Sequence, residues 1–181
     1  IRADLLLTSS LPRARQTAAL LAPALGRLPI EDDDLQELRV GPDADGLPLD
    51  EYTRRYGWVD LADHPLRPVD PGGESWASFM LRVATTLDRI TREHAGRTLC
   101  VVTHGGVIDG ALIHFFGLNA HALPKARLHT TNASITHWRH EERGGGWIWR
   151  LLRYNDDHHV RALEPGPTID YTAIPATNPE S

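Results

Sequence analysis

The sequence predicts a three-layer α/β/α sandwich with a mostly parallel central sheet. Short apolar runs alternate along the chain with segments of helical periodicity, and this alternation is typical of a parallel sheet covered by helices. The run at residues 98–103 is continuously apolar between its two threonines, as in a central strand that is buried on both faces. With 181 residues and 41% hydrophobic content, the chain has the size of one ordinary domain.

The N-terminal part of the chain predicts a strand followed by a helix. Residues 4–8 form a short apolar strand, and residues 12–25 have the spacing of a helix. Ser9 and Ser10 are candidates for the start of this helix, since serine side chains cap free backbone N–H groups. Pro23 is expected to kink the helix or to end it early.

The middle of the chain predicts a long loop region and one long helix. Residues 26–30 read as a loop, and residues 43–71 are rich in proline, glycine and charge, with one short helix at residues 49–55. Apolar side chains then recur at helical spacing over residues 76–96, which predicts an amphipathic helix that packs on the sheet.

The C-terminal part predicts one more helix and two strands. A helix is expected at residues 105–118, and residues 132–138 and 147–154 form a hairpin or two neighbouring strands. We expect one α/β domain over residues 1–160 and an extended, proline-rich tail over residues 161–181.

Composition and charge exclude several classes of protein. The net charge is −5 and the isoelectric point is near 6.0, whereas a nucleic-acid-binding protein is expected to show a basic face. No apolar run approaches the roughly 20 residues of a membrane-spanning helix, and the chain does not open like a secretory signal. Cys100, the single cysteine, lies in an apolar run and is expected to be buried, which fits a reducing, cytoplasmic setting. We therefore expect neither a nucleic-acid partner nor a membrane partner.

Basic side chains follow two of the predicted strands. Arg13 lies in the opening turn of the helix after the first strand, and His104 stands between the strand at residues 98–103 and a helix that Gly105 and Gly106 open. Ligands of parallel sheets bind at the carboxyl ends of the strands, and helix N-termini favour anions. The pattern predicts a site for a small anion, with phosphate as the natural candidate. An exposed arginine and a capping or core histidine are the alternatives.

Motifs along nearly the whole chain resemble those of the histidine phosphatase superfamily, branch 1, also called phosphoglycerate mutase-like. In chain order they are TSSLPRARQTA at residues 8–18, LQE at 35–37, GGES at 72–75 with Arg82, THGG at 103–106, NASI at 132–135, and Asn155 with His159. The resemblance implies the phosphoglycerate mutase-like fold and a site that transfers a phosphoryl group through a phosphohistidine.

The resemblance also implies a role for each motif residue. Arg13 is similar to an arginine that binds the phosphoryl oxygens, and His104 to a histidine whose cation stabilises the transferring group. Glu37 is similar to the general acid for the leaving group, a role that calls for partial burial beside the phosphate. Three further residues are expected to contact the phosphate: Ser10, Gly105 and Asn132. Glu74 and Ser75 are expected to be structural and to cap the long helix.

No cofactor and no metal are expected, and the expected ligand is a small phosphorylated metabolite. A homodimer is the candidate assembly. The tetrad from Asp156 to His159 is a poor metal site, because the side chains of adjacent residues point in different directions.

The nucleophile of this family is the histidine of an Arg-His-Gly motif after the first strand, and the 181 residues contain no such motif. The chain starts at Ile1 without a methionine, and the resemblance starts at the second strand of the family. We expect the nucleophilic histidine upstream of Ile1, in one further β-α unit of roughly 30 residues or more.

Three functions remain open from the sequence. The favoured one is a metal-independent phosphomonoesterase that acts on a small phosphate ester. A phosphoglycerate mutase would use the same pocket, but the short segment between Glu37 and Gly73 favours hydrolysis over mutase chemistry, which uses a long insert there. The third is a module that binds phosphate esters without turnover, if the nucleophile is truly lost.

Overall fold

The computed structural model describes residues 2–119 and 128–163. The elements in chain order are β1 (Leu5–Ser9), α1 (Pro12–Leu25), β2 (Pro29–Asp32), the short 3-10 helix η1 (Asp33–Leu35), α2 (Leu49–Tyr56), α3 (Trp76–Glu93), β3 (Leu99–Val102), α4 (Gly105–Phe115), β4 (Ile135–Arg143) and β5 (Gly146–Asp156).

The strands form two separate sheets in the described residues. β1 lies between β2 and β3, and both pairings are parallel, with Leu7 opposite Ile30 and Thr8 opposite Val102. β4 and β5 form an antiparallel hairpin. Its two-residue turn consists of Gly144 and Gly145, which both have positive φ angles (60° and 82°) that side chains disfavour and tight hairpins require. The predicted α/β class with a parallel sheet is confirmed.

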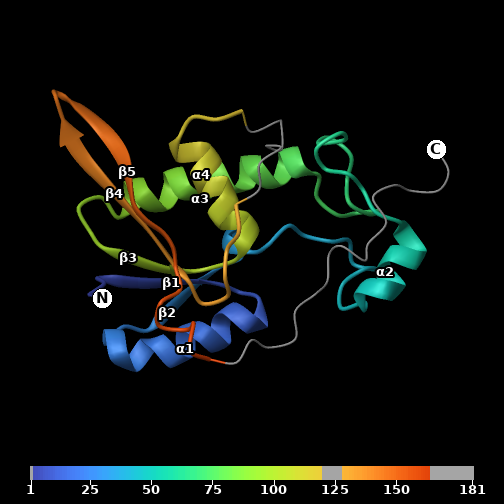
Figure 1. Cartoon of the computed structure of the whole chain (residues 1–181), viewed down its shortest axis with the longest axis horizontal. Helices are drawn as coiled ribbons and strands as arrows, with labels where there is room; N and C mark the ends of the chain where they lie inside the picture. Colours follow the sequence, from blue (N-terminus) through green and yellow to red (C-terminus); the bar gives the residue numbers. More distant parts are fainter. Residues whose placement is uncertain (1, 120–127, 164–181) are drawn as a thin grey trace.

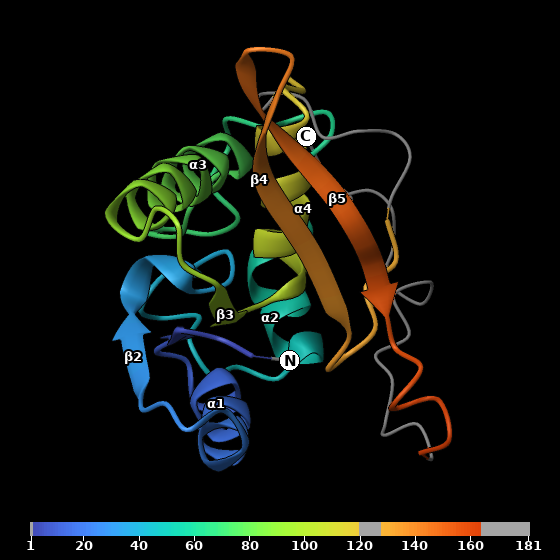
Figure 2. The same cartoon turned by 90° about the vertical axis from the view of Figure 1, so that its left-hand side faces the viewer.

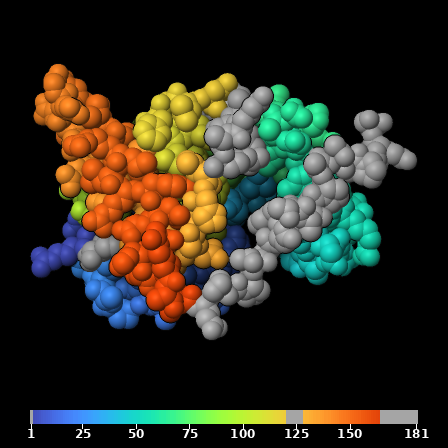
Figure 3. All heavy atoms as spheres, viewed as in Figure 1, coloured from blue at the N-terminus to red at the C-terminus, as the bar shows by residue number. Residues whose placement is uncertain are grey.

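Helices cover both faces of the parallel sheet. In Figures 1 and 2, α1 lies on one face, and α3 and α4 lie on the other. β1 is buried from Leu6 to Ser9 because its side chains alternate between these two helical layers. The hairpin lies alongside α4, where the Phe115 ring stacks on Trp149 with 4.1 Å between the ring centroids. In the space-filling view, the tip of the hairpin projects beyond the rest of the molecule (Figure 3).

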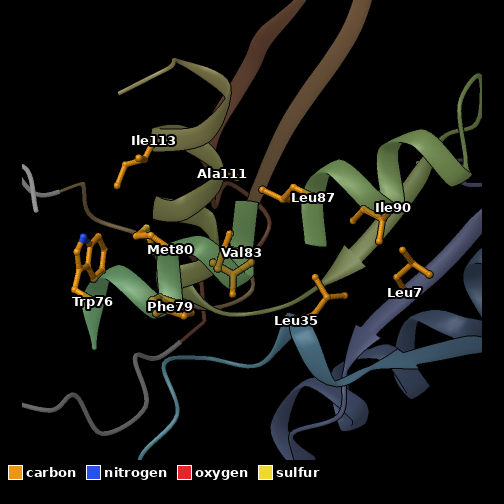
Figure 4. Close-up of a cluster of buried hydrophobic side chains, with 11 residues drawn as sticks. Leu7, Leu35, Trp76, Phe79, Met80, Val83, Leu87, Ile90, Ala111 and Ile113 are labelled. Atoms are coloured by element: carbon orange, nitrogen blue, oxygen red, sulfur yellow. The ribbon is translucent and has the colours of Figure 1, made fainter. Parts of the chain in front are cut away.

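The main core fills the space between the sheet and the two helices α3 and α4. Figure 4 shows Leu7 of β1 and Leu35 of η1 facing the apolar side of α3. Ser75 begins α3 in a capping box with Ser78, as expected for a serine before an amphipathic helix. Leu35 is fully buried, so the chain just before Glu37 is fixed by the core.

Two local predictions are wrong. Residues 29–32 form β2 instead of a loop; the strand is short, starts with proline and lies at the edge of the sheet, so it has no readable period. Of the two effects expected of Pro23, the early end is wrong: α1 continues to Leu25 and stops at Gly26 with a left-handed φ of 62°. Pro23 lies in the last turn, where a missing N–H removes only one hydrogen bond of the helix.

Other predictions differ from the structure in their bounds. The strands of the hairpin are longer than expected, and α3 and α4 each end three residues early. The four residues of β3, Cys100 included, are half-buried, and no described strand pairs with the second edge of β3. Most of the expected tail, from residue 164, lies outside the described residues.

Among the helices that are described, none combines the length and the apolar character needed to cross a membrane.

Leu35→Ala is expected to lower the free energy of unfolding by about 2–5 kcal/mol, because it leaves a cavity between η1 and α3. Leu28→Ala is the control: Leu28 is 86% exposed, and its truncation should change stability by no more than about 0.5 kcal/mol. Urea denaturation of both variants gives the comparison, and equal losses would contradict the assigned core.

Candidate functional site

The candidate site forms where β1 and β3 end side by side. Thr8 is opposite Val102, so Ser9 and Thr103 follow at the same edge of the sheet. The chain enters α1 after β1 and α4 after β3, which places the N-termini of two helices at this edge. Arg13 in the first turn of α1 and His104 just before α4 meet here, as the sequence predicts.

His104 is held by two hydrogen bonds. Arg13 Nε donates to His104 Nδ1 at 3.2 Å, and His104 Nε2 lies 2.8 Å from Ser9 Oγ. A guanidinium N–H can only donate, so Nδ1 carries no proton and the neutral ring donates from Nε2 to Ser9. Ser9 Oγ also accepts the backbone N–H of Leu11 at 3.2 Å. The ring is therefore fixed in one tautomer and one orientation.

The electrostatic surroundings keep His104 neutral in the free site. Burial, together with the positive charges of Arg13 and Arg82, lowers the pKa of His104 from 6.5 to about 4. His104 is only 7% exposed, so water does little to stabilise an imidazolium here. The cation expected from the resemblance is thus not the form of the free site at neutral pH. A bound phosphate dianion would oppose both effects and favour proton uptake.

The carboxylate of Glu37 also lies at the N-terminus of α4. It is half-buried, as its expected role requires, and its carboxylate accepts N–H groups of Gly106 and Leu38, both at 3.0 Å. The chain around it is tied to β3, because Thr103 Oγ1 donates to the carbonyl of Leu35 at 2.8 Å. The structure thus brings Glu37 and His104 to the same helix start.

The two glycines after His104 have different surroundings. A Cβ at Gly106 would overlap Glu37 Oε1 and would lie 2.9 Å from Phe79 Cε1, so only glycine lets the carboxylate reach the backbone N–H. A Cβ at Gly105 would meet nothing within 4 Å. Gly105 therefore borders open space, which is the environment that an expected phosphate contact needs.

Ser10 and Asn132 are not joined to this cluster. Ser10 Oγ donates to Asp33 at 2.5 Å and accepts Gln36 Nε2 at 2.7 Å, so its hydroxyl holds the chain around η1. Asn132 is exposed, and no hydrogen bond within the described part of the chain links it to Arg13 or His104. Their contacts with phosphate stay predictions.

Ser9 is the functional residue that the sequence analysis missed. Neither Ser9 nor Ser10 caps α1, whose N-cap is Leu11, and the buried hydroxyl of Ser9 contacts His104 instead. A polar residue at the end of an apolar strand, directly before a helix, is the signal that could have singled it out. No cluster of potential metal ligands occurs among the residues that the structure describes.

Fold and site together define a parallel α/β domain with an arginine–histidine cluster at the carboxyl edge of its sheet. The sequence model of the histidine phosphatase superfamily (branch 1) matches residues 1–157, and the chain belongs to this superfamily.

Two curated relatives cover much of the chain. It is 29% identical to the uncharacterized phosphatase PhoE of Bacillus subtilis (strain 168), over 87% of this chain and 72% of that protein. It is 34% identical to a 2,3-bisphosphoglycerate-dependent phosphoglycerate mutase of Methylobacterium sp. (strain 4-46), over 72% of this chain and 65% of the mutase, which is less than two thirds of that protein.

Solved structures confirm the fold. Bacillus stearothermophilus YhfR superimposes with a TM-score of 0.66 at 24% identity, over 85% of this chain and 74% of YhfR. A mycobacterial glucosyl-3-phosphoglycerate phosphatase superimposes with a TM-score of 0.64 at 24% identity, over 85% of this chain and 78% of that chain. The phosphoglycerate mutase-like fold is therefore shown.

The lowered pKa of His104 predicts that the free energy of unfolding depends on pH. A histidine titrates at 6.5 in the unfolded chain and at about 4 in this site, so unfolding takes up a proton between these values. The free energy of unfolding should fall as the pH is lowered from 6.5 to about 4, and it should fall less in His104→Asn. Urea denaturation across this window tests it; identical pH dependence in both proteins would contradict the assignment.

Gly106→Ala is expected to cost about 1–3 kcal/mol of stability, because the added methyl group must displace Glu37 or the Phe79 ring. Gly105→Ala is the matched control on the same helix, and there the better helix propensity of alanine should leave stability unchanged or raised. Thermal denaturation distinguishes the two variants. The interpretation of Gly106 fails if both melt alike.

Proposed function

We propose that this protein is a metal-independent phosphomonoesterase that hydrolyses a small phosphate ester through a phosphohistidine intermediate. The observation that carries the proposal is the hydrogen-bonded cluster of Arg13, His104 and Ser9 at the carboxyl edge of the parallel sheet. Phosphoryl transfer needs positioning and electrostatic stabilisation more than covalent chemistry from the protein, and this cluster supplies both.

In the first step, a nucleophilic histidine attacks phosphorus, the N–P bond forms and the ester P–O bond breaks. Arg13 would bind two phosphoryl oxygens with its planar guanidinium, and His104 would add hydrogen bonds and, once protonated, a positive charge. Glu37 would give its proton to the leaving alkoxide. In the second step water attacks phosphorus, the N–P bond breaks, and Glu37 takes the proton of the water.

The nucleophile in this proposal is the histidine of an Arg-His-Gly motif, which the 181 residues do not contain. The first experiment is therefore the intact mass of the protein purified from its source, compared with 20.1 kDa for this sequence. A larger mass with an Arg-His-Gly sequence in the added segment supports the phosphatase. A mass of 20.1 kDa would leave a module that binds phosphate esters.

A phosphoglycerate mutase is the second candidate, and the 34% identity to the Methylobacterium mutase favours it. The two reactions differ in the acceptor of the phosphoryl group, which is water in the phosphatase and a substrate hydroxyl in the mutase. Incubation with a phosphoglycerate separates them: release of inorganic phosphate supports hydrolysis, and conversion to the isomeric ester supports the mutase.

In the complete protein, His104→Ala is expected to lower kcat/KM for p-nitrophenyl phosphate by about 100-fold or more, because one preorganised donor to the transferring group is lost. His114→Ala is the control, since His114 lies on the same helix and pairs with Asp88 at 3.0 Å. Steady-state assays in the presence of a chelator give both values. Turnover close to that of the wild type in His104→Ala would refute the assigned role.

A further inference from the structure

The guanidinium of Arg82 donates hydrogen bonds to the backbone at and before Glu37. Arg82 lies on α3, and its side chain is only 10% exposed. Nη1 donates to the carbonyls of Asp34 at 2.8 Å and Gln36 at 2.9 Å, and Nη2 donates to the carbonyl of Glu37 at 3.1 Å. One side chain therefore fixes three carbonyl groups within four residues, at and just before Glu37.

Glu74 completes this arrangement from the other side. Its carboxylate accepts Arg82 Nε and Nη2, both at 2.7 Å, in the two-pronged geometry that makes such pairs strong. It also accepts the backbone N–H of Arg39 at 2.9 Å, and the N–H of Glu74 donates to the Arg39 carbonyl at 2.8 Å. The backbone is thus held on both sides of Glu37.

The partners of Glu74 keep its carboxylate ionised. Burial alone would raise the pKa of Glu74, but the hydrogen bonds and charges of Arg82 and Arg39 outweigh burial and hold the pKa below its usual value. The pair therefore stays ionised at neutral pH. A well-paired ionic group fixes geometry more closely than apolar packing, because each hydrogen bond has a preferred direction.

We propose that Arg82 and Glu74 are positioning residues that keep the Glu37 carboxylate at the N-terminus of α4, where it can pass a proton to the leaving group. The inference rests on the proposed function, in which Glu37 is the general acid. The chain of contacts runs from Glu74 to Arg82, from Arg82 to the backbone of Glu37, and from the Glu37 carboxylate to Gly106.

A positioning role and a merely structural role differ in their dependence on the leaving group. The p-nitrophenolate ion leaves without a proton, whereas an alkoxide needs the general acid. A loss of general acid therefore slows an alkyl phosphate far more than p-nitrophenyl phosphate. kcat/KM is the suitable parameter when formation of the phosphohistidine is irreversible, since the later hydrolysis common to both esters then does not enter it.

The experiment compares kcat/KM for glycerol phosphate and p-nitrophenyl phosphate in the complete protein and its variants. Glu37→Gln should lower the value for glycerol phosphate about 100-fold or more, and that for p-nitrophenyl phosphate much less. Arg82→Gln should show the same selectivity, with a loss at least about tenfold larger for the alkyl ester. Arg82→Lys keeps the charge but has one nitrogen for the acceptors, so it should restore the alkyl activity only in part.

Arg89→Gln is the matched control. Arg89 lies two turns further along α3, and its ion pairs are with Asp32 at 2.6 Å and Glu93 at 3.6 Å instead of with the backbone of Glu37. Loss of the Arg89 side chain should change kcat/KM for the two esters by the same factor. If Arg82→Gln proves too unstable to assay, Glu74→Gln, which keeps the shape of the side chain, should give the selective loss.

The outcomes separate the two proposals. A complete wild-type protein that hydrolyses neither ester contradicts the proposed function itself. The inference is overturned in a different case, in which the wild type is active and Glu37→Gln mainly lowers kcat/KM for the alkyl ester. If Arg82→Gln and Glu74→Gln then lower kcat/KM for both esters by the same factor, or leave it unchanged, the pair is structural. Selective loss in either folded variant supports it.

Discussion

The parallel pairing of β1 with β3 is the constraint on which the candidate site depends. These strands are far apart in sequence, yet their register places Ser9 and His104 at one edge, within hydrogen-bonding distance. Because each strand continues directly into a helix, two helix N-termini and their partial positive charges meet at the same place. A shift of one residue would turn Ser9 away from the histidine.

Glu37 reaches the site by a different route. It lies on no strand or helix, and its position comes from the buried Leu35 on one side and the pair of Glu74 and Arg82 on the other. The carboxylate of Glu37 also needs space at the start of α4, and Gly106 provides it because it has no side chain. The long helix α3 therefore serves the core with one face and the loop of Glu37 with another.

Apolar runs and periodicity predicted most of the fold, because β1 and β3 are largely apolar and α3 and α4 bury apolar residues at helical spacing. β2 left no pattern, because Ile30 is its only strongly apolar residue, whereas all four residues of β3 are apolar. In the site, Arg13, His104 and Glu37 were predictable from motifs and strand ends. The choice between Ser9 and Ser10 was not, because it depends on which side of the strand end faces His104, and only the tertiary packing decides that.

The hydrogen bond from Arg13 to His104 also bears on how strongly the proposed site would bind an anion. Nε of Arg13 and both ring nitrogens of His104 already have partners within the protein. An incoming anion must first compete with an internal acceptor for the guanidinium, and it gains only the difference between the two interactions. In the proposed phosphatase, this internal bond would lower the affinity for every anion by the same factor. Only a group that interacts strongly with the guanidinium, such as a doubly charged phosphoryl group, would then occupy the site at low concentration.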